Sequence, residues 1–340
     1  MRNETRLKLT AFAAAVAQLS GVANAADKFT VAPSVQQKLE TRLQASSNFL
    51  QRINLVPVTD QQGEKLGLGT SGTIAGTTDT TQKDRTPTDP TDLTGNQYHC
   101  QQINFDTALR YSKLDMWAKF PDFQTKVRDA IIKQQARDRI MIGFNGTSRA
   151  ATSNRVANPK LQDVAKGWLQ KYRDEAPARV MDEGATAGEI RVGTAAGADY
   201  KNLDALVMDA VNNLVDEVYA DDPELVVICG RSLLADKYFP LVNKDQENSE
   251  ALAADLIISQ KRIGGLQAVQ VPSFPANAIL ITRLDNLSIY YQDGARRRAI
   301  IDNPKRDQIE NYESSNDDYV VEDYRAGCLV ENIKTEWAAA

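Results

Sequence analysis

The longest polar stretch of the chain, Thr59–Asn96, interrupts an otherwise regular succession of apolar and polar positions. It is rich in Gly, Thr and Asp and has almost no large apolar side chains. Both of its flanks, Ile53–Val58 and Gln102–Leu109, have the pattern of strands. Because unstructured loops longer than about 15 residues are uncommon inside a compact domain, we expect a long excursion that leaves and returns as a two-stranded ribbon. Such an arm suits contact with a neighbouring molecule.

The segment after this excursion predicts a long helix. Pro121 suits the first helical position, where a missing N–H costs nothing. Apolar residues then recur on one face as far as Ile142, and Gly143 and Gly146 are expected to end the helix. At the usual rise per residue, residues 121–142 form a rod of about 33 Å, long enough to serve as a spine against which a sheet packs.

The second half of the chain has an α/β pattern. An apolar stripe from Leu203 to Val218 predicts a helix, a fully apolar strand follows at Leu225–Cys229, and Ser232–Leu241 predicts another helix. Residues 182–200 resemble a hairpin or a boundary loop. The other predicted elements are helices at Pro33–Leu43 and Leu161–Tyr172, and strands at Phe49–Val58, Leu266–Val271, Ala278–Thr282, Leu287–Tyr291, Gln308–Tyr312, Tyr319–Glu322 and Cys328–Val330. We expect the last three strands to return to the first sheet.

The N-terminus fits two interpretations. Basic residues precede the apolar run Leu9–Ala17, and Ala23-Asn24-Ala25 resembles the cleavage site of a secretion signal. However, Lys8 interrupts the apolar run and Gln18 closes it. The second interpretation is a short amphipathic helix whose successive turns are marked by Leu7, Ala11, Ala14 and Gln18. From these residues alone both stay open.

Composition narrows the class of protein. With 340 residues, 42% of them hydrophobic and 25% charged, the chain is typical of a soluble globular protein of about two domains. The net charge of −5 disfavours a nucleic-acid binder. The basic triplet Arg296-Arg297-Arg298 follows Asp293-Gly294, so we interpret it as a solvated turn. No other segment approaches the ~20 apolar residues of a membrane span.

Little in the chain suggests catalysis. The single histidine, His99, adjoins Cys100, but neighbours on a strand point to opposite faces and cannot pair. Cys229 and Cys328 lie in apolar runs, which indicates buried thiols and a reducing compartment. A thiol enzyme using Cys100 or Cys229 is therefore a weak alternative. We predict no enzyme and no catalytic, cofactor or metal site.

A group of acidic residues near the C-terminus is the remaining candidate for a cation site. We favour instead a charged strand edge that discourages wrong pairing. The group consists of Asp317, Asp318, Glu322 and Asp323.

Several long segments carry a resemblance to a known family. They are WLQKYRDEAPARVM (Trp168–Met181), Ala235–Asn243, Ala253–Leu266, Asp285–Asp293 and Asn311–Glu331. From Phe29 on, nearly the whole chain resembles the major capsid proteins of temperate tailed phages of the phage P2 type. The resemblance implies an α+β fold of the HK97-type capsid class, with an N-terminal arm, an extended loop, a peripheral domain with a long spine helix, and an axial domain.

The resemblance also implies a domain plan. Residues 1–28 would be an assembly segment removed on maturation, with processing near Lys28 and Phe29. The plan continues with the N-arm at 29–56, the extended loop at 57–105, the peripheral domain at 106–195 with its spine helix at 121–142, the axial domain at 196–285, and a return to the peripheral domain at 286–340. Loop contacts with the adjacent subunit are expected from Gly63, Glu64, Lys65, Lys83, Asp84 and Arg85.

The function implied is that of a major capsid protein that self-assembles into pentamers and hexamers of an icosahedral shell around phage double-stranded DNA. The implied partners are copies of itself, a scaffolding protein or maturation protease, a portal protein, and packaged DNA without sequence-specific contact. No cofactor and no membrane are implied, and the protein would reside in the virion after assembly in the host cytoplasm. The alternative is a secreted bacterial binding protein with a signal peptide at 1–25.

Overall fold

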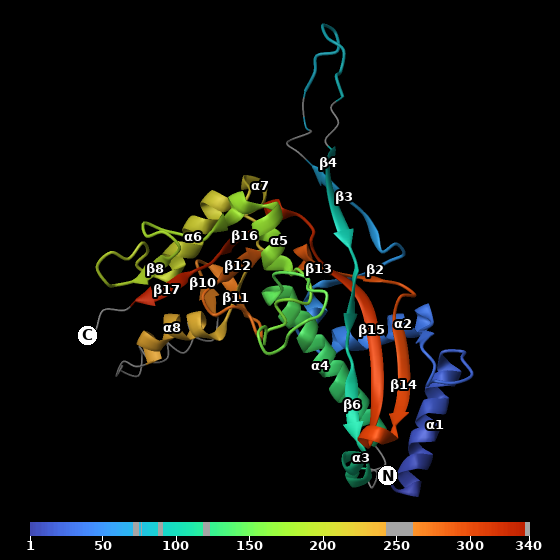
Figure 1. Ribbon diagram of the computed structural model, residues 1–340. Coiled ribbons are helices and arrows are strands. Elements are labelled where there is room, and N and C mark those ends of the chain that lie inside the picture. Colours follow the sequence, from blue (N-terminus) through green and yellow to red (C-terminus); the bar gives the residue numbers. More distant parts are fainter. Residues whose placement is uncertain (71–74, 76, 88–90, 118–122, 243–260, 337–340) are drawn as a thin grey trace, which may run out of the picture.

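The computed structural model describes residues 1–70, 75, 77–87, 91–117, 123–242 and 261–336. Figure 1 shows two lobes joined side by side and a narrow ribbon that projects from them. The N-terminus lies at the far end of one lobe, and the described chain ends on the other lobe.

The first lobe is built on a seven-stranded sheet whose central member is the long strand β15 (Gln308–Val321). The strand order is β1-β14-β15-β13-β2, and β5 and β6 also pair with β15. The pairings are antiparallel except that of β13 with β2. The bounds are β1 Phe29–Thr30, β2 Asn54–Val58, β5 Gln101–Asn104, β6 Thr107–Arg110, β13 Leu287–Gln292 and β14 Arg297–Asn303.

Helices surround this sheet. The spine helix α4 covers Phe123–Asn145; the predicted start at Pro121 lies outside the described residues. The prediction that Gly143 ends the helix is wrong, because the helix continues through it to Asn145. A Cβ at Gly143 would lie 2.2 Å from the ring of Trp168, so this glycine permits close packing rather than termination. The other helices are α1 Asn3–Leu19, α2 Pro33–Ala45, α3 Tyr111–Trp117 and α5 Trp168–Glu175.

The second lobe contains a six-stranded sheet of order β10-β11-β9-β12-β16-β7 and a two-stranded sheet of β17 and β8. Strand β16 was expected to return to the first sheet; it pairs instead with β12 and β7. The strands are β7 Val180–Met181, β8 Ile190–Gly193, β9 Val226–Cys229, β10 Arg262–Ile263, β11 Leu266–Gln270, β12 Ile279–Thr282, β16 Gly327–Val330 and β17 Ile333–Glu336. The helices are α6 Leu203–Leu214, α7 Glu217–Ala220 and α8 Arg231–Val242.

Short 3-10 turns connect several of these elements. They cover Leu50–Arg52, Pro177–Arg179, Leu284–Asn286, Pro304–Arg306 and Tyr324–Ala326. The first of them replaces the beginning of the strand that was predicted from Phe49.

Three other predicted elements have different boundaries. The helix expected from Leu161 begins at Trp168, because Leu161 has a left-handed φ of 59° that no α-helix accommodates. The apolar stripe to Val218 is divided at Val215, whose backbone is extended. The two strands expected at Gln308–Tyr312 and Tyr319–Glu322 are one continuous strand, because the acidic residues between them, Glu313, Asp317 and Asp318, are buried in ion pairs.

The ribbon is formed by β3 (Gln62–Thr70) and β4 (Thr91–His99) in antiparallel register. A ribbon was predicted, but its strands were placed on the wrong segments. The flanks Ile53–Val58 and Gln102–Leu109 belong to the seven-stranded sheet, and the ribbon lies within the polar stretch itself. Main-chain hydrogen bonds hold this pair of strands together and require no apolar side chains. The glycine-rich sequence therefore gave no pattern from which these two strands could be located.

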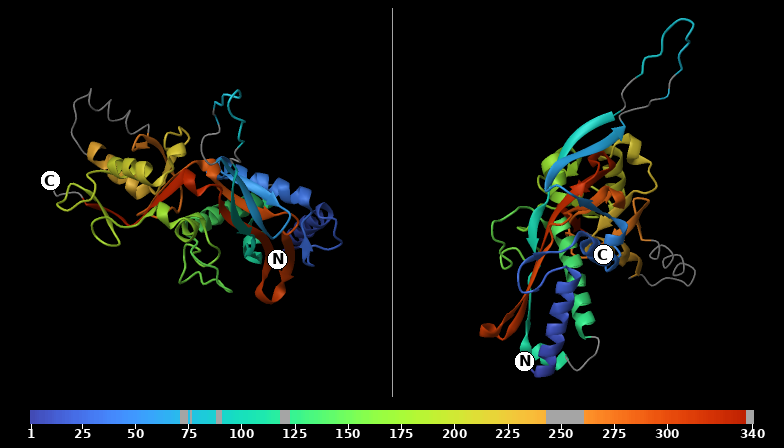
Figure 2. Two further views of the ribbon diagram at one scale, coloured as in Figure 1. Left: turned by 90° about the horizontal axis from the view of Figure 1, so that it is seen from above. Right: turned by 90° about the vertical axis from the view of Figure 1, so that its right-hand side faces the viewer.

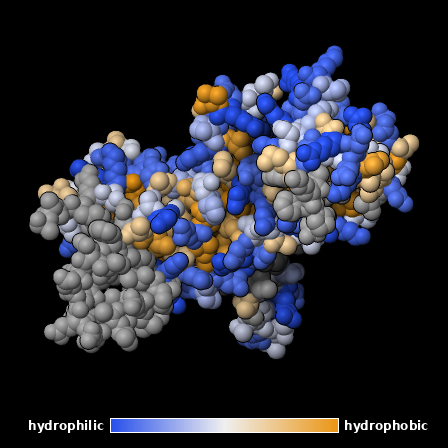
Figure 3. Space-filling model, turned by 90° about the horizontal axis from the view of Figure 1, so that it is seen from below, coloured by the Kyte–Doolittle hydropathy of each residue, from blue (hydrophilic) through white to orange (hydrophobic). Residues whose placement is uncertain are grey.

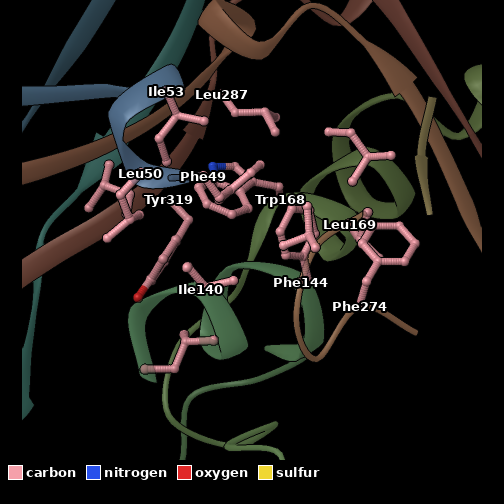
Figure 4. Packing of buried hydrophobic residues seen from close by; sticks show 14 of the residues in the cluster. Phe49, Leu50, Ile53, Ile140, Phe144, Trp168, Leu169, Phe274, Leu287 and Tyr319 are labelled. Carbon is pink, nitrogen blue, oxygen red and sulfur yellow. The ribbon is translucent and has the colours of Figure 1, made fainter. Parts of the chain in front are cut away.

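The main hydrophobic core joins the two sheets around Trp168, which is fully buried. Its ring contacts Phe144 and Tyr319 at centroid distances of 5.0 and 5.3 Å, and its Nε1 donates to the Ser288 carbonyl at 3.0 Å. Figure 4 shows these aromatic rings converging from the spine helix, α5 and β15. The spine is therefore fixed to the lobe junction.

Candidate assembly surfaces

The base of the ribbon is fastened to the body by Lys65. Its Nζ donates to the Val321 carbonyl at 2.7 Å and also to the Glu322 carbonyl, and it lies 3.2 Å from the Glu322 carboxylate. The side chain is only 8% exposed. Burial lowers the pKa of Lys65, and the Glu322 carboxylate works against this shift. One lysine thus attaches the ribbon to the end of β15.

Tyr98 makes the second contact at the base. It pairs across the ribbon with Gly63, where a Cβ would lie 2.7 Å from the tyrosine hydroxyl. Its ring packs against Tyr290 at a centroid distance of 5.3 Å. The backbone N–H of His99 donates to Asp318 at 3.0 Å, and Asp318 in turn pairs with Lys171 of α5. Beyond this base the ribbon projects away from both lobes (Figure 2).

The residues expected to contact an adjacent subunit are distributed along this ribbon. Glu64, Lys83, Asp84 and Arg85 are exposed and Gly63 is half-buried. Lys65 differs from them, because its side chain is occupied within its own chain. The intersubunit contacts themselves stay a prediction.

A buried ionic junction, formed by Glu40, Arg139, Arg296, Glu313 and Asp317, joins α2, the spine helix and the sheet. Arg139 of the spine donates to Glu40 of α2 and to Asp317 of β15, the latter at 2.9 Å from Nε. Arg296 donates to Glu40 at 2.7 Å and to Glu313 at 2.6 Å. All five side chains are at most 6% exposed. Glu40 therefore bridges two arginines and holds the helix α2 in place.

The charges of this junction balance when the half-buried Arg298 is included, because three arginines then face three carboxylates. Burial raises the pKa of Asp317, although Arg139 opposes the shift. Burial would also raise the pKa of Glu313, but Arg296 and Arg298 outweigh it and lower that pKa. Breaking such a pair leaves an uncompensated buried charge.

Two interpretations from the sequence are corrected here. Arg296-Arg297-Arg298 is not a solvated turn, because Arg296 is fully buried and β14 begins at Arg297. The acidic group is not a charged edge either, because β15 has neighbours on both sides and Asp317 and Asp318 are buried in ion pairs. Asp323 pairs with Arg325 at the following turn.

The N-terminal segment is a helix, α1, packed against the first lobe. The residues that mark its successive turns lie on the exposed face: Leu7 is 72% exposed, and Ala11, Ala14 and Gln18 are also exposed. The opposite face carries the bulkier residues Leu9, Phe12 and Val16, which pack against the sheet. Burial favours the face with more apolar area.

The proposed processing residues lie just beyond this helix. Lys28 is exposed, whereas Phe29 is 7% exposed and belongs to β1, which pairs with β14.

The three cysteines and His99 are the remaining candidates for chemistry. All three cysteines are buried and free, and burial raises the pKa of Cys229 to about 11 and those of Cys100 and Cys328 to about 12. His99 is exposed while Cys100 is buried, as strand alternation predicts. Among the described residues there is no group of three or more potential metal ligands. In that same part of the chain, no helix has the length and apolar content needed to cross a membrane.

The surface is mostly hydrophilic in the view of Figure 3, with apolar residues gathered towards the middle of that face. Large exposed apolar residues include Leu7, Met116, Val156, Met208, Val218, Ile301 and Tyr312.

Comparison with known proteins identifies the family to which this chain belongs. Residues 8–333 match the family described as phage major capsid protein, P2 family. The chain belongs to this family. It is 61% identical to a protein of Escherichia phage P2 named "Capsid proteins", over 98% of this chain and 96% of that one. It is 42% identical to the major capsid protein of Serratia phage KSP20, over 98% and 97% of the two chains.

A solved structure is similar over the whole length. A chain of the satellite phage P4 procapsid that includes the size determination (Sid) protein is 56% identical, with a TM-score of 0.83 and complete coverage of both chains. The fold is therefore the α+β, HK97-type capsid fold, and the protein is a phage capsid protein, a structural component of the virion. These findings favour the capsid assignment and give no support to the secreted alternative.

Proposed function

We propose that this protein builds the icosahedral head of a tailed phage by assembling into pentamers and hexamers around double-stranded DNA. The observation that carries the proposal is the projecting ribbon β3–β4. Beyond its base at Lys65 and Tyr98 it extends away from the lobes of its own chain (Figure 1).

A projecting ribbon suits contact between subunits of one shell. Added strands bind mainly through main-chain hydrogen bonds, so few large side chains are needed. Head-to-tail contacts of this kind close into rings when the rotation between subunits permits it. In this proposal Glu64, Lys83, Asp84 and Arg85 contact the adjacent subunit, and the two lobes act as the peripheral and axial domains.

The proposal includes partners and a compartment. Assembly occurs in the host cytoplasm with a scaffolding protein and a maturation protease, which removes residues 1–28 by cutting near Lys28 and Phe29. A portal protein occupies one vertex. The net charge of −5 suits the inner wall of a shell that does not bind DNA tightly during packaging. The protein itself catalyses no reaction.

A ribbon-shortened variant tests the proposal. Residues 66–95 are replaced by Asn-Gly, which keeps Lys65 and Tyr98 in place and closes the strands with a two-residue turn. We expect the variant to stay as small species in sedimentation and electron microscopy, under conditions in which the unaltered chain, expressed with its scaffold, forms shells. Val156→Ala, a single change at a side chain that is 94% exposed and lies outside the ribbon, is the control and should still assemble. Closed shells of normal size from the shortened variant would overturn the proposal.

A further inference from the structure

The N-terminal helix α1 is fastened to the first lobe at its start. The carboxylate of Asp115 in α3 accepts hydrogen bonds from the backbone N–H of Arg2 at 2.9 Å and from the Thr5 hydroxyl at 2.7 Å. The N-terminal ammonium lies 3.8 Å from the same carboxylate. Three groups at and just before the start of α1 therefore converge on one side chain of the body.

The middle of α1 fills a groove between the spine helix and the sheet. Leu9, Phe12 and Val16 pack against Leu114, Ile300 and Ile309. A cavity of about 110 Å³ remains beneath this face, and Val127 and Ile131 of the spine helix contribute to its wall. Figure 2 shows α1 lying alongside the first lobe.

The end of α1 shares a small core with the proposed processing segment. Ala17 packs in one cluster with Ala25, Phe29 and Val31, all at most 7% exposed. The Ala25 carbonyl accepts from the Ile300 N–H, and the Val31 N–H donates to the Arg296 carbonyl, each at 2.8 Å. The chain on both sides of the Lys28–Phe29 bond is thus tied to β14 as an edge strand.

Such a strand is a poor substrate for a protease. Proteolysis concentrates in exposed, mobile backbone, and a folded segment is cut through its transiently opened form. A protease needs the backbone and the side chains next to the bond, yet Phe29 is buried and β1 is bonded to β14. Because α1 and β1 share the cluster of Ala17 and Phe29, opening β1 exposes apolar side chains at the end of α1.

We propose that α1 is a latch: while it occupies its groove, the bond between Lys28 and Phe29 is protected, and release of the helix makes that bond accessible. The inference rests on the proposed processing of residues 1–28, and it assigns to α1 the control of when processing occurs. Assembly or scaffold binding would act on the bond only by displacing the helix.

Limited trypsin digestion of the full-length, unassembled chain tests the latch, because trypsin cuts after Lys28. Mass spectrometry measures cleavage there and, in the same sample, after Lys83 and Arg85 at the exposed ribbon tip. Phe12→Ala removes a side chain from the groove. The matched control is Leu7→Ala, which removes an apolar side chain from the exposed face of the same helix.

We expect the unaltered chain to be cut after Lys28 at least about tenfold more slowly than after Arg85. Phe12→Ala should speed the Lys28 cut about tenfold, whereas Leu7→Ala should leave it unchanged, and the ribbon-tip cuts should not respond to either variant. Equal cleavage after Lys28 and Arg85 in the unaltered chain, or equal responses of the two variants, would overturn the latch. Shell formation is a separate measurement, so its failure would count against the proposed function and not against the latch.

Discussion

The ionic junction of the spine and the base of the ribbon use buried charge in different ways. At the junction, Arg139 and Arg296 are enclosed by carboxylates from α2 and β15, so every element is held by several charged hydrogen bonds. At the ribbon base, one lysine meets two backbone carbonyls and one carboxylate. The first arrangement fixes a rigid platform. The second, together with the Tyr98–Tyr290 ring contact and the hydrogen bond from His99 to Asp318, attaches only the base of a projecting element. Substitutions at the ionic junction should therefore lower the stability of the whole chain, whereas substitutions at the ribbon base should have smaller, local effects.

The largest effect is expected at the centre of the junction. Arg139→Met removes the ion pair of the buried Asp317 and leaves Glu40 with Arg296 alone, so the free energy of unfolding should fall by about 3–5 kcal/mol. Urea denaturation of the unassembled chain measures it. Arg128→Ala on the same helix, whose ion pair with Asp129 is exposed, should cost at most about 1 kcal/mol. Similar losses in the two variants would show that the junction is not a special source of stability.

A smaller loss is expected where the spine approaches α5. Gly143→Ala would place a methyl group 2.2 Å from the Trp168 ring, so the free energy of unfolding should fall by about 1–3 kcal/mol. Thermal unfolding measures this loss. Gly230→Ala is the comparison, because its Cβ would have no neighbour closer than 3.3 Å. If Gly143→Ala is the milder change, the close approach is not what requires glycine there.

At the ribbon base the effect should be local. Lys65→Met removes the attachment to Val321 and Glu322, so amide hydrogen exchange in residues 62–65 and 97–99 should speed up about tenfold. Exchange in the spine helix should be unchanged. Lys83→Met at the exposed tip is the control and should alter neither region. Faster exchange in the spine of the Lys65 variant would mean that platform and ribbon are one cooperative unit.

The smallest effect concerns pH. The pKa of Glu313 lies below its ordinary value of 4.5 in the folded chain, so the stability from its charge is complete above about pH 4.5 and is lost as the pH falls towards the folded pKa. The raised pKa of Asp317 acts in the opposite sense. Between about pH 5 and pH 3, Glu313→Gln should therefore lose less stability than the unaltered chain. A steeper acid loss in the variant, measured by urea denaturation across this range, would contradict the assignment.

Elements with a strong apolar period were predictable from the sequence. The buried strand β9 and the helix α8 agree with the predictions to within one residue at each end, because burial on all sides or on one face leaves a clear pattern. The ribbon strands could not be located in this way, because backbone pairing alone leaves no apolar pattern.

The junction could not be read from local sequence for another reason. Arg296 follows an Asp-Gly turn and adjoins two more arginines, which resembles a solvated loop. Of its two carboxylate partners, Glu313 lies 17 residues away on another strand and Glu40 lies 256 residues away in the chain. A charged residue can be assigned to the interior only when its counter-charge is known, and no local pattern supplies a partner so distant.

The position of Glu40 has a consequence for the shortened polypeptide. Trimming at Lys28 would discard α1 and the contacts at Asp115, but α2 begins afterwards, at Pro33. The Glu40 carboxylate of α2 would still pair with both Arg139 and Arg296. The segment that becomes the new N-terminus would therefore be held by ion pairs that had already formed in the uncut precursor.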